Sequence, residues 1–298
     1  KFYTSFYIKS SMEFLMVNTV VIPAAGLGTR LFTVTKESPK EMVPVFYKTN
    51  DGTILLKPLL EVIFENLYDS GFRNFCFVVG RGKETIENHF SPHYDFIELL
   101  KKKGERDYVK ILSKLYRKIE KSSIVWVRQH IQKGIGPATI LAKDFVGDKP
   151  FLFHAGDLYL PKTKYLQDIV RIHKKYRPSA TIGLKMVTDP KRYGVATIKK
   201  TNDNIEILKV VEKPKKPTTN FALTGVNIFE PEIFDAIKNT RAGIHGEIQL
   251  TDAIQTLIKT KHNVLGSFMQ KSEPCIDIGV PSTYFDALKY SYSHIMKK

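Results

Sequence analysis

The chain has 298 residues, 43% of them hydrophobic, which is enough to form the core of one large domain or two smaller ones. Its 46 basic residues against 30 acidic ones give a formal charge of +16, which suits a polyanionic ligand but does not distinguish nucleic acid from nucleotide. The two cysteines, Cys76 and Cys275, exclude a disulfide framework and favour a reducing cytoplasm, and no apolar run reaches the roughly 20 residues that cross a bilayer.

Residues 1–15 precede the first regular pattern, and we expect them to be an appended arm or a remnant of the expression vector. They lack the apolar stretch and the small-residue cleavage site of a secretion signal. Residues 16–298 are expected to form a single domain. Its first half covers about residues 16–160 and its second half about residues 161–298.

Short apolar runs alternate with helical patterns along most of the chain. This alternation predicts an α/β fold with a Rossmann-like, doubly wound and mostly parallel sheet. The first apolar residues spaced as in a helix lie at 59–67, and Gly71 is placed to end that helix. In the first half and just beyond it, strands are expected at residues 18–24, 73–79, 123–129, 150–156 and 179–187.

Residues 95–121 are rich in charge and have helical spacing, so we expect an exposed helical insertion whose lysines face solvent. The second half then changes character. It has closely spaced strand patterns that predict a smaller β-rich portion able to carry part of a ligand site. These strands are expected at residues 193–200, 204–214 and 221–229, followed by a helix at 247–259, strands at 263–270 and 273–279, and a last helix at 281–296.

The turn Gly26-Leu27-Gly28 follows the first strand directly. Glycines let the backbone approach a ligand closely and aim successive N–H groups at one anion, which favours phosphate. The dinucleotide fingerprint would need a glycine where this chain has Leu31, and the P-loop pattern is absent. The basic residues that follow, Arg30, Lys36 and Lys40, are able to hold a triphosphate.

Several ordered blocks now carry a resemblance. "GLGTRL" and "PKEMVPV" resemble the sugar-phosphate nucleotidyltransferases, and "TKESPKEM" with "GEIQLTDAI" is similar to the bacterial and archaeal UTP-glucose-1-phosphate uridylyltransferases. The blocks "HAGDL", "VEKP", "TGVNIF" and "CIDIG" agree in order. The resemblance implies transfer of a uridylyl group from UTP to glucose 1-phosphate, with Mg²⁺ as cofactor and a homodimer or homotetramer as the assembly.

The resemblance also implies roles for individual residues. Arg30, Lys40 and Lys213 would be the catalytic cations, with Lys213 on the phosphate of the sugar substrate. Asp157 ends an apolar strand at the sheet edge where such folds bind ligands, and it would hold Mg²⁺ together with Asp277. The nucleotide would be bound by Ala25, Gly26, Gly28, Glu41, Gln129 and Gly134. The sugar would be bound by Gly194, Glu212, Gly225 and Asn227.

One local pattern conflicts with these roles. Glu212 and Lys213 are neighbours on an expected strand, so they should point to opposite faces unless a bulge intervenes. Both are nevertheless assigned to the same substrate.

Alternatives to this function remain open. A glutamine amide at position 129 suits the imide edge of uracil, but thymine presents the same edge, so a thymidylyltransferase or a broad-range enzyme is the nearest alternative. A nucleic-acid-binding protein would explain the charge but not Asp157 or Asp277, so we expect neither nucleic acid nor membrane as a partner. A homologue that binds sugar nucleotides without turnover conflicts with the intact acidic and basic set.

Overall fold

The computed structural model describes residues 17–49, 51–243, 246–270 and 272–296, so the expectation for residues 1–15 lies outside the described residues. Its strands are β1 (Thr19–Ala24), β2 (Pro44–Lys48), β3 (Ile54–Pro58), β4 (Asn74–Val79), β5 (Ser123–Arg128), β6 (Phe151–His154), β7 (Leu158–Tyr159), β8 (Ala180–Met186), β9 (Gly194–Lys200), β10 (Ile205–Glu212), β11 (Phe221–Phe229), β12 (Val264–Phe268) and β13 (Ile276–Asp277). Its helices are α2 (Leu59–Asp69), α3 (Glu84–His89), α4 (Tyr94–Lys102), α5 (Arg106–Glu120), α6 (Ile135–Ile140), α7 (Lys143–Val146), α8 (Lys164–Tyr176), α9 (Glu232–Lys238), α10 (Leu250–Lys259) and α11 (Pro281–Met296). Within these residues, no helix is long and apolar enough to span a bilayer.

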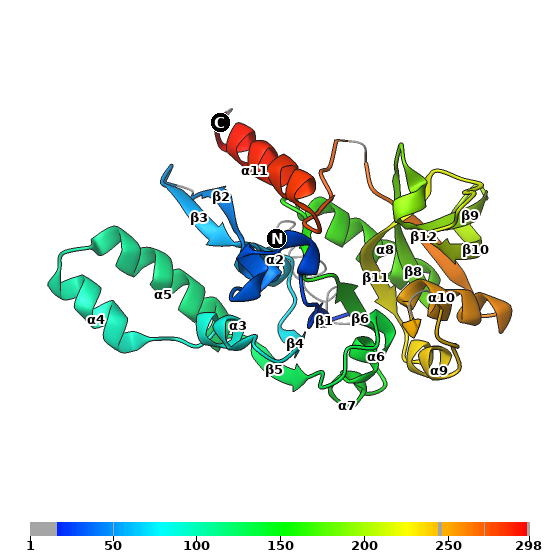
Figure 1. The fold of residues 1–298 in the computed structure, drawn as a ribbon, viewed down its shortest axis with the longest axis horizontal. Coiled ribbons are helices and arrows are strands. Elements are labelled where there is room, and N and C mark those ends of the chain that lie inside the picture. The colour runs from blue at the N-terminus through cyan, green and yellow to red at the C-terminus, as the bar shows by residue number, and fades with distance from the viewer. Residues whose placement is uncertain (1–16, 50, 244–245, 271, 297–298) are drawn as a thin grey trace, which may run out of the picture.

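A nine-stranded sheet forms the centre of the molecule, in the order β5-β4-β1-β6-β11-β8-β12-β10-β9 (Figure 1). The expected α/β fold is confirmed. The strands of the first half, β5, β4, β1 and β6, pair in parallel. In the second half the sheet is mixed, because β11 runs antiparallel to both β6 and β8, and β10 runs antiparallel to β12 and β9.

Apolar side chains cover both faces of the central strands. Phe75 and Phe77 of β4 belong to one buried cluster, whereas Cys76 and Val78 between them belong to the other. Successive side chains of a strand point to opposite faces, so a continuous apolar run indicates helices on both sides. Figure 1 shows this arrangement, with α2 and α8 on one side of the sheet and α6, α7 and α9 on the other. Cys76 and Cys275 are both free thiols.

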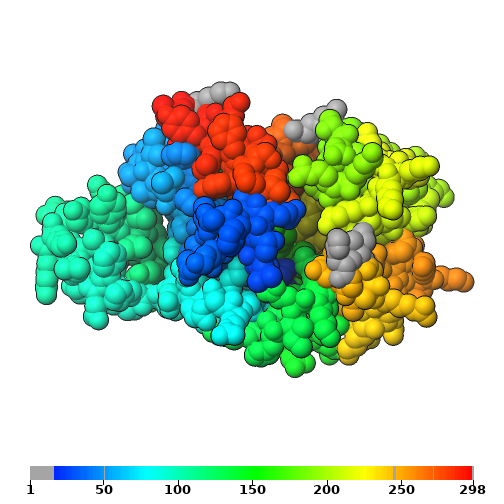
Figure 2. All heavy atoms as spheres, viewed as in Figure 1, coloured from blue at the N-terminus to red at the C-terminus, as the bar shows by residue number. Residues whose placement is uncertain are grey.

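The predicted insertion is confirmed as an outlying pair of helices, α4 and α5, which project from the body of the molecule (Figures 1 and 2). Gly104, at φ +78°, separates the two helices. Lys101 and its two neighbours are exposed, as expected. Lys118 departs from the expectation, because its ammonium lies 3.3 Å from Glu65 and 2.9 Å from Asp69 of α2 and so ties the insertion to the core.

Two expected boundaries differ in the structure, and one hairpin was not predicted. The helix expected from residue 247 begins only at Leu250, since the preceding residues form an extended loop. The strand expected at 273–279 is reduced to the two residues of β13, which pair with β7 outside the main sheet. The β2–β3 hairpin was not predicted. It packs against α11, where the Tyr284 hydroxyl donates to the Pro44 carbonyl at 2.9 Å (Figure 1).

Candidate active site

The glycine turn lies at the carboxyl end of β1. Gly28 has φ +66°, and a Cβ there would lie 3.0 Å from Cβ of Thr35, whose hydroxyl donates to the Gly28 carbonyl at 2.8 Å. Both the backbone angle and the packing therefore require glycine at this position. Gly26 differs, because a Cβ there would meet nothing closer than the Lys40 side chain at 3.6 Å. Its missing side chain leaves room on the side of the turn that faces a cavity.

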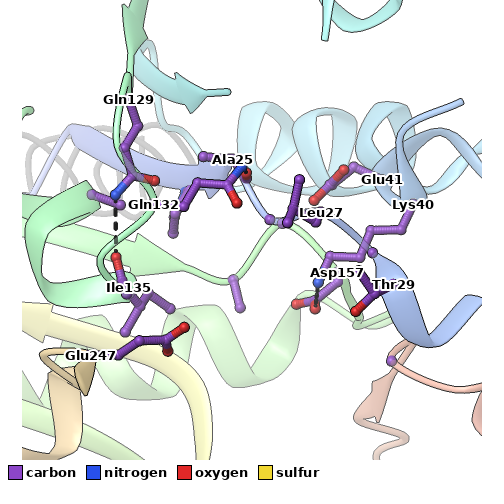
Figure 3. Close-up of a pocket in the computed structure, with 18 of the residues that line it drawn as sticks. Ala25, Leu27, Thr29, Lys40, Glu41, Gln129, Gln132, Ile135, Asp157 and Glu247 are labelled. Carbon is purple, nitrogen blue, oxygen red and sulfur yellow. Dashed lines mark hydrogen bonds and ion pairs between the residues drawn. The ribbon is translucent and has the colours of Figure 1, made fainter. Parts of the chain in front are cut away.

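That cavity has a volume of about 370 Å³ and lies between the two halves of the chain. It brings together most of the residues predicted for the nucleotide and its phosphates. Figure 3 shows Gln129, Ile135 and Glu247 at one end and Lys40, Asp157 and Thr29 at the other. The predicted residues that line it are Ala25, Gly26, Gly28, Arg30, Lys40, Glu41, Gln129, Gly134 and Asp157.

Charged side chains gather at the second of these ends. The Lys40 ammonium forms a hydrogen-bonded ion pair with Oδ2 of Asp157, and both side chains are mostly shielded from solvent. Burial lowers the pKa of Lys40, but the negative charges of Asp157 and Glu41 outweigh burial, so its pKa lies above the ordinary value. Lys40 is therefore a fixed positive charge at neutral pH.

Asp277 is held beside this pair by the short β13–β7 ladder. The Ile278 N–H donates to the Asp157 carbonyl at 2.8 Å, so the two aspartates lie on adjacent backbone segments. Burial and the charge of Asp157 raise the pKa of Asp277, while Lys40 and Arg30 oppose them. A Cβ on Gly279 would lie 3.0 Å from Nη2 of Arg30 and 3.1 Å from Oδ2 of Asp277. The Arg30 guanidinium and the Asp277 carboxylate therefore both lie against the backbone of Gly279.

This donor set fits a hard divalent cation. Mg²⁺ is usually held by one or two carboxylates together with phosphate oxygens of the substrate, and Asp157 and Asp277 supply two carboxylates that repel each other until a cation neutralises them. No group of three or more ligating side chains forms within the described residues. The phosphates of a substrate would therefore have to complete the coordination.

Glu41 lies under the floor of the cavity and is almost fully buried. Its carboxylate accepts a hydrogen bond from the Lys83 ammonium at 2.9 Å, and Lys83 is itself buried. Burial raises the pKa of Glu41, and the Lys83 charge opposes that shift. The pair joins the loop after the glycine turn to the loop after β4.

Lys83→Met should lower the free energy of unfolding by about 3–5 kcal/mol, because it leaves the Glu41 carboxylate buried without its cation. Since burial raises the pKa of Glu41, the unpaired carboxyl takes up a proton as the pH falls, and the destabilisation should be smaller at about pH 5 than at about pH 8. Urea denaturation measures both values, with the exposed Lys121→Met as control. A loss below about 1 kcal/mol at the higher pH would show that the pair contributes little.

The opposite end of the cavity is built from the loop between β5 and α6. Gln129 is buried, and its Nε2 donates to the Gly134 carbonyl at 3.3 Å. Gly134 has φ +103°, and a Cβ there would lie 2.8 Å from the Ile248 carbonyl, so the turn accepts only glycine. Gln132, which was not predicted, donates from Nε2 to the Ala25 carbonyl at 2.8 Å and so fixes the entrance to the glycine turn.

The residues predicted for the sugar form a second cluster beside the cavity. Gly194 and Glu212 are register partners on β9 and β10, and Oε2 of Glu212 accepts a hydrogen bond from the Thr251 hydroxyl at 2.7 Å. A Cβ on Gly194 would lie 2.7 Å from that hydroxyl. Lys213 follows the end of β10 with φ +40°, and its ammonium lies 3.5 Å from Oε1 of Glu212. This left-handed residue resolves the alternation conflict, because it brings both side chains together.

Gly225 and Asn227 lie on β11 where its pairing with β8 shifts register. Gly225, at φ +82°, accepts a hydrogen bond from the Ala155 N–H at 2.9 Å, which places it behind the cavity wall. Asn227 is buried, and its Oδ1 accepts a hydrogen bond from the Gly183 N–H at 3.1 Å. Asn227 is not among the residues that line the nucleotide cavity. Its hydrogen bond to Gly183 joins β11 to β8 where their register shifts.

His154 precedes the predicted metal ligand and is fully buried. Burial lowers its pKa to about 4, and its Nδ1 lies 2.9 Å from the Ala155 carbonyl. It is therefore a neutral structural histidine, donating to that carbonyl.

Several cavity residues were not assigned from the sequence: Gln132, Glu247, Gln249 and Gly279. Two of them, Glu247 and Gln249, belong to the block "GEIQLTDAI", and Gly279 belongs to "CIDIG". Both blocks carry the family resemblance in the sequence, so their other polar residues and glycines could have been predicted as site residues from the sequence alone.

Residues 19–293 match the family described as nucleotidyl transferase. A protein of Staphylococcus epidermidis named UTP-glucose-1-phosphate uridylyltransferase is 36% identical over 247 residues, 81% of this chain and 81% of its own length. A solved UDP-glucose pyrophosphorylase complexed with UDP-glucose matches with a TM-score of 0.79 and 28% identity, covering 94% of this chain and all of its own. A UTP-bound UGPase from Acinetobacter baumannii matches with a TM-score of 0.79 and 26% identity, covering 92% and 93%.

Proposed function

Because the chain belongs to the nucleotidyl transferase family, we propose that it transfers the uridylyl group of UTP to glucose 1-phosphate, forming UDP-glucose and pyrophosphate. The observation that carries the proposal is the single cavity in which the glycine turn, Arg30, Lys40 and Asp157 meet. A glycine-lined backbone and two fixed cations suit a triphosphate. The relatives named above act on or bind the same nucleotides.

In this proposal the nucleotide spans the cavity from end to end. The uracil lies beside Gln129 and Gly134, where a carboxamide offers both a donor and an acceptor to the imide edge. The backbone at Ala25 and Gly26 approaches the base and ribose, and the buried Glu41 supports this floor from beneath. The phosphates extend past Gly28 toward the cluster around Lys40.

The sugar 1-phosphate enters from the side of the second half of the chain. Glu212, fixed by Thr251, accepts hydrogen bonds from sugar hydroxyls, and Gly194 leaves room for the ring. Lys213 pairs with the phosphate, while Gly225 and Asn227 shape the sheet behind the site. These contacts hold the sugar phosphate close to the triphosphate. The two anions repel each other, and the site must overcome this repulsion before the reaction can occur.

The chemistry then needs positioning and charge neutralisation rather than a covalent nucleophile. An oxygen of the sugar phosphate attacks the α-phosphorus in line, the bond to the bridging oxygen breaks, and pyrophosphate leaves. Lys40 neutralises charge at the α-phosphate, and Arg30 neutralises the departing pyrophosphate. Asp157 and Asp277 would hold Mg²⁺, which when bound lowers the repulsion between the two substrates.

We also propose that the chain assembles as a homodimer or homotetramer, which sedimentation velocity tests.

Lys213→Ala should raise the KM for glucose 1-phosphate by about 10-fold or more and change the KM for UTP little, because the lost ammonium faces only the sugar substrate. Steady-state kinetics with each substrate varied in turn measures the two effects. The neighbouring Lys215→Ala, which changes another lysine of the same segment, is the control. A change confined to UTP would place Lys213 on the wrong substrate.

The function is tested by pyrophosphate release with Mg²⁺, crossing UTP, dTTP, CTP and ATP with the 1-phosphates of glucose, galactose, mannose and N-acetylglucosamine. Rapid release only with UTP and glucose 1-phosphate supports the proposal. Comparable release with dTTP favours the second candidate, a broad-range or thymidylyl enzyme, which remains open because thymine and uracil share their imide edge. Release with no pair would reject both.

A further inference from the structure

The block "GEIQLTDAI" marks a segment to which the proposed reaction assigns no ligand contact. The structure places Glu247 and Gln249 on the cavity wall, while Thr251 binds Glu212 in the sugar cluster. The extended residues before α10 thus line the nucleotide cavity, while Thr251, in the first turn of α10, contacts the sugar cluster. Glu247 is the acidic member of the set, and a carboxylate in a cavity for a polyanion requires a reason.

The position of Glu247 is fixed by its backbone neighbours. The Ile248 N–H donates to the Lys133 carbonyl at 3.1 Å, and the Gly136 N–H donates to the Ile248 carbonyl at 3.0 Å. A Cβ on Gly134 would lie 3.0 Å from Cβ of Glu247. The segment is therefore clamped onto the loop that forms the base end of the cavity.

The charge environment of Glu247 differs from that of the other cavity carboxylates. Asp157 pairs with Lys40, and Glu41 pairs with Lys83. Among the residues that the structure describes, no lysine or arginine pairs with Glu247, and its Oε2 accepts one hydrogen bond, from Nε2 of Gln249 at 2.8 Å. An unneutralised carboxylate repels phosphates, so the part of the ligand beside it must be neutral and must donate hydrogen bonds.

A nucleoside triphosphate has two such parts, the imide N–H of the base and the hydroxyls of the ribose. Gln129 and Gly134 already face the base. Figure 3 shows Glu247 at the same end of the cavity as Gln129 and Ile135, with its side chain directed into the cavity. The ribose is joined directly to the base, so a nucleotide whose base lies beside Gln129 places its ribose in this part of the cavity. A vicinal diol donates two hydrogen bonds, and a carboxylate is the group that binds ribose hydroxyls in dinucleotide sites.

We infer that Glu247 binds the ribose hydroxyls of the nucleotide and selects ribonucleotides over 2′-deoxyribonucleotides. The inference rests on the proposed function, because it takes UTP as the nucleotide in the cavity. It adds a second basis for rejecting dTTP. The methyl group of thymine is a small steric difference, whereas a missing 2′-hydroxyl deprives a cavity carboxylate of one of its two donors.

The test compares UTP, 2′-deoxy-UTP and 5-methyl-UTP in the wild type, Glu247→Ala and Glu247→Gln. In the wild type, kcat/KM for 2′-deoxy-UTP should be about 10-fold or more below that for UTP, and 5-methyl-UTP should be accepted within a few fold. Glu247→Ala should lower kcat/KM for UTP by about 10- to 100-fold and lower the value for 2′-deoxy-UTP less, because only the 3′-hydroxyl contact is lost there. Glu247→Gln, which keeps an acceptor oxygen, should restore part of the preference. The exposed Glu232→Ala is the matched control.

An equal loss for UTP and 2′-deoxy-UTP in Glu247→Ala would overturn the inference, and so would a wild type that does not distinguish the two. Calorimetric binding of both nucleotides, which requires no turnover, separates this outcome from a failure of the proposed function. A wild type that binds UTP more tightly than 2′-deoxy-UTP but releases no pyrophosphate would reject the reaction and retain the ribose contact.

Discussion

Asp157→Asn should lower kcat by about 10²-fold or more while the protein remains folded. The carboxylate lies near Lys40, Arg30 and Asp277. It pairs with Lys40 and, in the proposed function, would hold the divalent cation. Asparagine keeps the shape and one acceptor oxygen but loses the charge. The loss should therefore appear in turnover, measured by steady-state pyrophosphate release at saturating substrates.

The control for this variant is Asp148→Asn, the same change in an exposed loop before β6. Thermal unfolding of both variants should stay close to the wild type, because asparagine keeps the size of the side chain and an acceptor oxygen for the Lys40 ammonium. Near-normal turnover in Asp157→Asn would remove this residue from the metal site. Raising the Mg²⁺ concentration should recover part of the activity if weaker metal binding is the main defect.

Lys40→Ala should lower kcat/KM for UTP by about 10²- to 10³-fold, the range found when one preorganised donor is removed from a transition-state site. Two effects add here. The phosphate loses a cation, and Asp157 and Asp277 lose the positive charge that offsets their mutual repulsion. Lys40→Arg should recover little, because a planar guanidinium does not replace a compact ammonium in so close a contact.

Steady-state kinetics with UTP varied measures this effect, and calorimetric binding of UTP shows how much of it lies in the ground state. Lys102→Ala, on the exposed end of α4, changes the net charge equally and should leave both values unchanged. A kcat/KM for Lys40→Ala within about fivefold of the wild type would contradict the role of Lys40 at the α-phosphate.

The sequence predicted correctly those strands, helices and turns whose conformation depends on their own residues. The apolar run of β4 fills both faces of the sheet, and Gly71, at φ +103°, follows α2 as its spacing predicted. The turn at Gly26 and Gly28 pointed to phosphate because glycine has few other uses directly after a buried strand. These features need no knowledge of distant partners.

Other features depend on contacts between distant segments, and the sequence did not reveal them. Lys118 has the spacing of an exposed helical lysine, yet Glu65 and Asp69 of another helix draw it inward. Asn227 is predicted at the sugar, and the sequence does not reveal that its Oδ1 accepts a hydrogen bond from the Gly183 N–H beside a register shift in β11. The alternation of side chains along a strand predicts that Glu212 and Lys213 point to opposite faces. The structure differs because Lys213, just after the end of β10, has a left-handed backbone conformation.

We expect this cavity to join the uridylyl group of UTP to glucose 1-phosphate with loss of pyrophosphate. The most direct measurement is ³¹P nuclear magnetic resonance of a reaction containing the purified protein, Mg²⁺, UTP and glucose 1-phosphate. Both substrate signals should fall together while the diphosphate signals of UDP-glucose and the signal of pyrophosphate rise in equal amounts. Formation of UMP or UDP from UTP with an unchanged glucose 1-phosphate signal, or no change in either substrate, would contradict it.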